Sequence, residues 1–218
     1  MAVKFLDAKR LQGTNAERVA LTATPILQSE TATDTSSTVK PSHSGWTAEL
    51  GIQIQSDLNG ESMGSVTIKG KRSGSIAGNM WITHYDGSTG TPTSTKSVEQ
   101  ASNNASDGSS AEITFTFSTP ITLATDDALL FSYTQAGVGT AYFTLDVEAG
   151  GGGTGYTGGY VTRNNAGTWS IVSPDYGVYM IVYGVAETLN LPAGTIFSTT
   201  DTYKYYWWDG ADTWSESG

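Results

Sequence analysis

Two histidines, His43 and His84, are the side chains best suited to acid–base or metal chemistry near neutral pH. His43 follows Pro41 in a polar stretch, which predicts a solvated side chain. His84 lies two positions after Ile82 in an alternating segment, which predicts a partly buried, hydrogen-bonded side chain. The sequence contains no HExxH, GxSxG or phosphate-loop motif. We therefore expect no catalytic residue and no enzymatic activity.

Acidic side chains offer a second kind of chemistry. Asp126 and Asp127 are adjacent, and Asp146 precedes Glu148 by two positions. Carboxylates at such spacing can bind calcium. Aspartates between two strands also favour turns, because they accept hydrogen bonds from their own backbone. The sequence favours the turn for Asp126 and Asp127, leaves calcium open, and assigns no other cofactor and no metal ligand.

Aromatic side chains are the strongest candidates for binding, since Trp and Tyr contribute both sugar-stacking faces and interface hot spots. Tyr156 and Tyr160 flank the glycine-rich loop at 150–159, where they are candidates for contact with a glycan. Further rings crowd near the C-terminal end, in a segment too short to bury them within itself, which predicts a subunit interface. These candidate interface residues are Tyr203, Tyr205, Tyr206, Trp207, Trp208 and Trp214.

The composition excludes several classes of protein. The chain has 218 residues, no cysteine and a formal net charge of -10. The lack of cysteine excludes disulfides, thiol nucleophiles and zinc–thiolate sites. The acidic balance argues against nucleic-acid binding, which requires basic patches. No apolar stretch is long enough to span a membrane, and Asp7 appears before any apolar run develops, so we expect neither membrane insertion nor a signal peptide.

The elements that must position these residues are short strands. Between residues 45 and 184, apolar and polar residues alternate with the period of two that is typical of half-buried strands. The clearest run extends from Glu112 to Phe117, and we expect Pro120 to end it. Turn residues separate a series of such segments. This spacing predicts an all-β fold, an antiparallel β-sandwich of the jelly-roll type.

Two terminal segments flank the predicted sandwich. Residues 1–44 are rich in Thr and Ser in their second half. This composition predicts that the segment is an extended arm or linker. Residues 185–218 begin as a linker and end in two segments, 195–197 and 203–208, that can pair as a small aromatic hairpin. The predicted organisation is therefore an arm at 1–44, a sandwich at 45–184, and a linker with a C-terminal hairpin at 185–218.

Four motifs follow one another through the predicted sandwich: Ser65–Lys69, Glu112–Leu123, Gly167–Ser170 and Tyr179–Gly184. In their order they resemble a jelly-roll module of viral and metagenomic surface proteins. The resemblance implies a non-catalytic β-sandwich, similar to carbohydrate-binding modules, that is attached to tail, fibre or capsid components.

The two ends of the chain carry further resemblances. The segment from Leu191 to Trp214 is similar to one that ends structural proteins of marine phages and archaeal viruses, and Lys4–Gly13 resembles the opening of the same proteins. Together these segments imply a virion component, made in the host cytoplasm without a signal peptide and carried on the extracellular particle surface.

We expect, on these grounds, a non-enzymatic virion structural protein: a capsid, decoration or tail-fibre component. Its partners would be copies of itself and other virion proteins, which it would contact through its terminal segments. The alternative function is a carbohydrate- or receptor-binding module that mediates attachment to glycan on a host surface. Neither function requires nucleic acid or insertion into a membrane.

Overall fold

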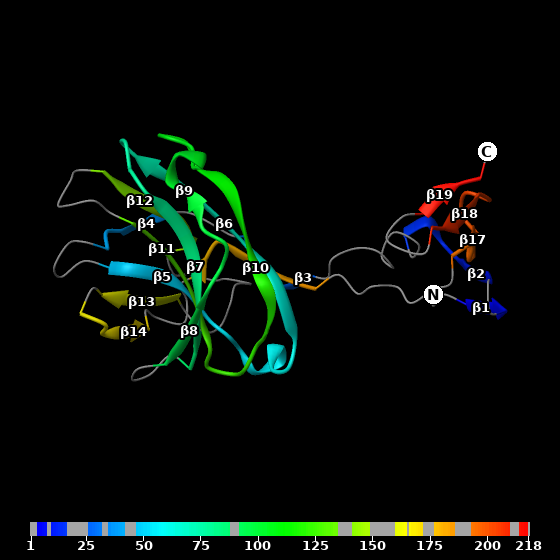
Figure 1. Cartoon of the computed structure of the whole chain (residues 1–218), viewed down its shortest axis with the longest axis horizontal. Coiled ribbons are helices and arrows are strands. Elements are labelled where there is room, and N and C mark those ends of the chain that lie inside the picture. The colour runs from blue at the N-terminus through cyan, green and yellow to red at the C-terminus, as the bar shows by residue number, and fades with distance from the viewer. Residues whose placement is uncertain are drawn as a thin grey trace. The chain divides into compact units, whose positions relative to one another are not determined.

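The computed structural model describes residues 4–7, 10–16, 26–31, 35–41, 47–87, 92–134, 141–148, 160–164, 166–171, 177–185, 193–209 and 214–217. The chain divides into two compact units (Figure 1). The terminal unit comprises Met1–Pro25 together with Ala186–Gly218, and the sandwich unit comprises Ile26–Val185. Each unit is built from β-strands, so the predicted all-β class is confirmed.

One sheet of the sandwich unit, sheet B, is organised around a long central strand. Its strands are β3 (Ile26–Glu30), β4 (Thr35–Val39), β6 (Ser62–Ser73), β10 (Ala111–Thr122), β12 (Tyr142–Glu148), β15 (Gly177–Val178) and β16 (Met180–Gly184). Strand β6 pairs with β10 along one edge and with both β12 and β16 along the other. Strand β4 then pairs with β12, and β3 with β16; all of these pairs are antiparallel.

The opposing sheet, sheet C, has the order β14-β13-β5-β11-β7-β8, with β9 also paired to β7. Its strands are β5 (Thr47–Gln53), β7 (Asn79–Asp86), β8 (Thr93–Lys96), β9 (Gln100–Ala101), β11 (Ala128–Tyr133), β13 (Tyr160–Asn164) and β14 (Trp169–Ile171). All of its pairs are antiparallel. Two 3-10 turns, η1 (Ser56–Leu58) and η2 (Ser102–Asn104), lie in the connections.

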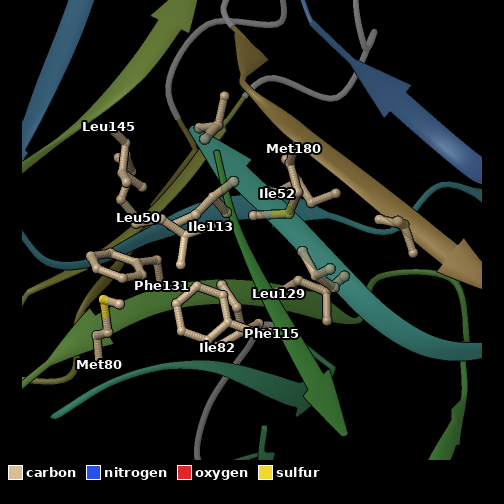
Figure 2. Packing of buried hydrophobic residues seen from close by; sticks show 14 of the residues in the cluster. Leu50, Ile52, Met80, Ile82, Ile113, Phe115, Leu129, Phe131, Leu145 and Met180 are labelled. Carbon is tan, nitrogen blue, oxygen red and sulfur yellow. The ribbon is translucent and has the colours of Figure 1, made fainter. Parts of the chain in front are cut away.

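The two sheets pack face to face around a single apolar core, and the predicted β-sandwich is therefore confirmed. Leu50, Ile82 and Phe131 from sheet C lie against Phe115 and Met180 from sheet B, and all are fully buried (Figure 2). The alternation of apolar and polar residues in each strand accounts for this packing, because successive side chains point to opposite faces of a sheet.

The terminal unit is a separate five-stranded sheet, sheet A, with the order β1-β2-β17-β18-β19. Its strands are β1 (Lys4–Asp7), β2 (Arg10–Gly13), β17 (Ile196–Thr199), β18 (Tyr205–Trp208) and β19 (Trp214–Glu216). The predicted C-terminal hairpin is present as β17 and β18. Strand β2 pairs with β17 in parallel, so the two ends of the chain share one sheet. Asp201 accepts a hydrogen bond from the backbone N–H of Asn15 at 2.9 Å and reinforces this connection.

The described parts of residues 1–44 differ from the predicted extended arm. Strands β1 and β2 belong to sheet A, whereas β3 and β4 lie in sheet B. The Thr- and Ser-rich β4 buries Val39 completely and keeps Thr35 and Ser36 exposed. Main-chain hydrogen bonds to β12 and the buried side chain of Val39 hold this strand in the sheet. A strand of low hydrophobic content can therefore join a sheet.

Strand β10 also continues beyond Pro120, where the sequence predicted its end. Its pairing to β6 shifts register between Thr116 and Ile121 and resumes with Ile121 opposite Met63. A proline lacks a backbone N–H and fits only where no ladder hydrogen bond is required. The irregular stretch meets that condition, because the residues from Ser118 to Pro120 are exposed and outside the paired register.

Candidate functional site

The C-terminal aromatic residues lie on both faces of sheet A. In β18 the exposure alternates: Tyr206 and Trp208 are 8% and 2% exposed, whereas Tyr205 and Trp207 are 59% and 54% exposed. Because side chains of a strand alternate between faces, one face of sheet A is packed and the other is open.

The packed face forms the small core of the terminal unit. Leu11 of β2, Phe197 of β17 and Tyr206 are buried together, and Trp214 packs against them. The rings of Phe197 and Trp214 lie edge to face with centroids 5.8 Å apart, and those of Trp208 and Trp214 are 5.2 Å apart. Such contacts are favourable beyond the apolar area that they bury.

The open face presents aromatic and aliphatic side chains that the described part of the chain leaves exposed. Ile196 is 36% exposed and lies opposite Trp207 in the register of β17 and β18. Tyr205 lies on the same side of β18, and Tyr203, which is 86% exposed, has a positive φ in the turn before it. We name Ile196, Tyr205 and Trp207 the aromatic face. None of these side chains carries a charge.

The structure therefore separates the six predicted interface residues into two groups. Tyr205 and Trp207 lie on the aromatic face and Tyr203 is exposed in the turn before it, whereas Tyr206, Trp208 and Trp214 belong to the packed side. Strand β2 adds Leu11 to the same face of sheet A, so Tyr206 and Trp208 are buried and Trp214 is partly buried within the unit.

A second cluster, which the sequence analysis did not single out, lies on the outer face of sheet C. The Tyr85 hydroxyl donates to the Glu49 carboxylate, at 2.8 Å from Oε2, and Arg163 Nη1 donates to the same Oε2 at 3.1 Å. Arg163 Nη1 also lies 3.1 Å from the Tyr85 hydroxyl. Burial, followed by the nearby Glu49 charge, raises the pKa of Tyr85.

Strand register brings this cluster together. Arg163 pairs with Glu49 across β13 and β5, and with Trp169 across β13 and β14. The Trp169 and Tyr85 rings meet edge to face at 5.0 Å, and the Arg163 guanidinium lies over both rings. No local signal in the sequence marks Glu49, because it occupies one of the polar, outward-facing positions of an alternating strand.

His84 and Asp127 form a buried pair with a structural role. The sequence predicted a partly buried, hydrogen-bonded side chain for His84 and a turn residue for Asp127. His84 Nε2 lies 2.8 Å from Asp127 Oδ2. The same carboxylate accepts the backbone N–H groups of Gly87 and Ala124, each at 2.9 Å. Asp126, with a φ of 72°, completes the turn that precedes β11. The Asp127 carboxylate therefore accepts hydrogen bonds from the connection after β7 and from the connection after β10. It holds these two connections together.

Asp146, the other predicted acidic candidate, lies on the outer face of sheet B. It accepts a hydrogen bond from the Ser110 hydroxyl at 2.6 Å and lies 3.7 Å from the Lys69 ammonium. Beside it, Tyr179 donates to Glu112, and this hydrogen bond is the main cause that raises the pKa of Tyr179 to about 12. Within the described residues, no group of three or more His, Asp or Glu side chains is arranged to hold a metal ion.

Several predicted residues fall outside the description. Tyr156, His43 and the glycines at 150–159 are not among the described residues. Tyr160 begins β13 and its backbone pairs with Ile52; its side chain is not described. None of the helical segments in the described ranges has the length and apolar character of a membrane span.

Comparisons with protein-family models, with curated proteins and with solved structures each found no match to this chain.

Proposed function

We propose that this protein is a non-enzymatic structural protein that self-associates through the aromatic face of its terminal unit. The observation that carries the proposal is the exposure of Tyr205 and Trp207 on one side of a sheet whose other side is packed. Exposed rings of this size, gathered on one face, are typical of protein interfaces.

A second copy of the chain is the partner that best fits the charges. Copies that each carry a net charge of -10 repel one another except where their contact surfaces are uncharged. The side chains of the aromatic face carry no charge and meet that condition. If copies of the chain associate around a twofold or ring axis through the aromatic face, this face is buried in every copy.

The virion role is part of the same proposal and rests on the sequence resemblances described above. In this role, the sandwich unit has the topology of a jelly roll. It is the part of the capsid, decoration or tail-fibre component that is displayed. The terminal unit then makes contact with further copies and with other virion proteins. The particle surface is the proposed location, after synthesis in the host cytoplasm.

Light scattering of the purified full chain tests the self-association. We expect a defined oligomer for the natural sequence and a monomer for a Tyr205→Ser/Trp207→Ser double variant, because the exchanged side chains are already exposed and their loss leaves the packed side intact. Val98→Ser is the matched control, since Val98 is an exposed apolar residue of the sandwich unit. The control should keep the oligomer.

Two results would contradict the proposal. A natural chain that is monomeric at all accessible concentrations removes the basis for self-association. An oligomer that survives the double variant but dissociates on Val98→Ser places the contact on the sandwich unit instead.

A further inference from the structure

We propose that Tyr203 anchors a twofold dimer by packing its ring on the Ile196 and Trp207 end of the aromatic face of a second copy, which makes the reciprocal contact. This anchoring role rests on the proposed self-association. It adds a residue that lies outside the aromatic face, in the turn between β17 and β18, and it fixes the orientation of the two copies.

Tyr203 has a backbone conformation that its residue type does not favour. Its φ is 55°, in the left-handed region that glycine and asparagine adopt more easily than a bulky residue. The turn holds this conformation, because the Thr199 N–H donates to the Lys204 carbonyl and the Lys204 N–H donates to the Thr199 hydroxyl, each at 2.9 Å. Asparagine would fit the same turn at lower cost, so the backbone geometry does not explain the tyrosine.

Packing within the described part of the terminal unit does not explain the tyrosine either. Tyr203 is 86% exposed, more than any other large hydrophobic residue that the structure describes. It lies outside the buried cluster of Leu11, Phe197 and Tyr206. Tyrosine is enriched among the residues that contribute most to binding at protein interfaces. A contact with a partner is therefore the role that the position of this ring supports.

The hairpin of β17 and β18 places its exposed side chains at three successive levels. Ile196 lies opposite Trp207 at the end away from the turn, and Ser198 lies opposite Tyr205 two residues nearer to the turn. Tyr203 lies a further two residues along, in the turn itself. Because a strand rises about 3.3 Å per residue, the levels of Trp207 and Tyr203 are each about 7 Å from the level of Tyr205.

This equal spacing suits two copies that pack face to face with their hairpins antiparallel. A twofold axis at the level of Tyr205 places the turn of each copy over the Ile196 and Trp207 end of the other. That end is apolar and partly exposed, so it offers the Tyr203 ring a surface to cover. Each copy then covers the part of the aromatic face that the other leaves open.

Charge favours the antiparallel arrangement over a parallel one. Asp201 lies in the same turn as Tyr203 and is exposed. With the hairpins parallel, the two turns meet and bring the Asp201 carboxylates of both copies together, where they repel each other. With the hairpins antiparallel, the two carboxylates lie at opposite ends of the contact.

A Tyr203→Asn variant of the full chain tests the anchoring role. The change removes the ring and keeps a residue that tolerates the positive φ. We expect the dissociation constant of the dimer, measured by analytical ultracentrifugation, to rise by about tenfold or more. Thr200→Ala, at an exposed position of the same turn, is the matched control and should leave the dissociation constant unchanged.

A stability measurement separates the anchoring role from a structural one. Tyr203→Asn is added to the Tyr205→Ser/Trp207→Ser variant, in which the loss of the aromatic face leaves a monomer, so that dissociation of the dimer does not affect the result. There, the change should keep or raise the thermal midpoint of the terminal unit, because it relieves the unfavourable φ and removes no internal contact.

Cysteine cross-linking tests the orientation, since the chain contains no cysteine of its own. Thr200→Cys marks the turn. Ser215→Cys, opposite Trp207 in the register of β18 and β19, marks the other end; both positions are exposed. With a short bismaleimide, a mixture of the two variants should cross-link one to the other, whereas each variant alone should not cross-link to itself.

The remaining outcomes contradict the proposal. Dimerisation of Tyr203→Asn at natural strength shows that the ring makes no contact, and a lower midpoint in the monomeric background assigns the ring a structural role. Self-cross-linking of either cysteine variant, or no cross-link in the mixture, contradicts the antiparallel arrangement. In all these cases a dimer that Tyr205→Ser/Trp207→Ser disrupts leaves the proposed function intact. A monomeric natural chain contradicts that function and the anchoring role together.

Discussion

Phe131 in the sandwich unit and Trp207 in the terminal unit are both large rings in central strands of their sheets, but only Phe131 is fully buried. Phe131 lies between two sheets and meets the rings of Phe115 and Phe143 at 6.1 and 5.2 Å. Trp207 lies on a single sheet and is 54% exposed. The sandwich unit provides a second layer for its core face, whereas the described part of the terminal unit provides cover for one face of sheet A only.

This difference shows how a surface for a partner can arise from the same alternating pattern that builds a core. A strand with apolar residues at every position needs cover on both faces. Strand β18 has this composition, Tyr-Tyr-Trp-Trp, and the described part of the terminal unit covers two of its four rings. The uncovered rings favour association with a partner.

The largest expected effect comes from removing a ring of the sandwich core. Phe131→Ala should lower the free energy of unfolding of the sandwich unit by about 3–5 kcal/mol, because it leaves a cavity between the sheets. Hydrogen exchange read by mass spectrometry should show faster exchange throughout Ile26–Val185. Phe197→Ala is the counterpart in the terminal unit and should accelerate exchange in sheet A. Equal acceleration of both units by either change would break the distinction between them.

A close backbone contact in the sandwich unit gives the second effect. A Cβ on Gly51 would lie 1.8 Å from the backbone oxygen of Leu129, so Gly51→Ala forces β5 and β11 apart. We expect a loss of about 3 kcal/mol, measured by urea unfolding. Gly194→Ala, in the terminal unit, introduces a Cβ into open space at a φ of +81° and should cost about 1 kcal/mol. A larger loss for Gly194→Ala would contradict the tighter packing inferred for the sandwich.

Alkaline pH should destabilise the sandwich unit through Tyr133. Burial raises the pKa of Tyr133 to about 12, whereas a tyrosine in the unfolded chain titrates near 10. The unfolded state therefore loses this proton first, and the stability that is present below pH 10 falls as the pH rises to 12, by about 2 kcal/mol. Unfolding by urea at pH 9 and at pH 12 measures the loss.

Tyr133→Phe tests the origin of this pH dependence. The variant loses the hydrogen bond to the Val39 carbonyl, 3.0 Å long, at every pH, and it should show a smaller decline between pH 9 and pH 12. Tyr206→Phe, in the terminal unit, should leave the decline of the sandwich unchanged. An identical decline in Tyr133→Phe and the natural protein would assign the effect to other groups.

The smallest effect is expected at the exposed ion pair of the terminal unit. Lys204 and Glu216 are each about half exposed, and such pairs contribute little because water and salt screen them. Lys204→Ala should leave the thermal midpoint unchanged within error. A clear fall in this midpoint, at high salt as well as low, would show that the side chain of Lys204 stabilises sheet A by packing.

The alternation of apolar and polar residues predicted the strands of the sandwich well. The expected segment from Glu112 to Phe117 lies within β10. The Asp126–Asp127 turn was also correctly predicted. These features depend on local spacing, which the sequence displays directly.

Features that depend on distant pairings could not be predicted in this way. The polar strands β3 and β4 have no apolar pattern, and only their partners β16 and β12 identify them as strands. The network of Glu49, Tyr85 and Arg163 joins three strands, and no local motif marks it. Likewise, the burial of Tyr206 depends on Leu11 at the opposite end of the chain.

The all-β class, the core-facing residues of the main strands and the concentration of aromatic rings near the C-terminal end follow from the amino-acid sequence alone. They do so because side-chain alternation and turn residues act over a few positions. The folded arrangement of the strands is needed to see which rings are exposed, that the two ends of the chain share sheet A, and which charges meet on sheet C. Those outcomes depend on strand register between segments far apart in the chain, and register is set by packing and main-chain hydrogen bonds once the sheets have formed.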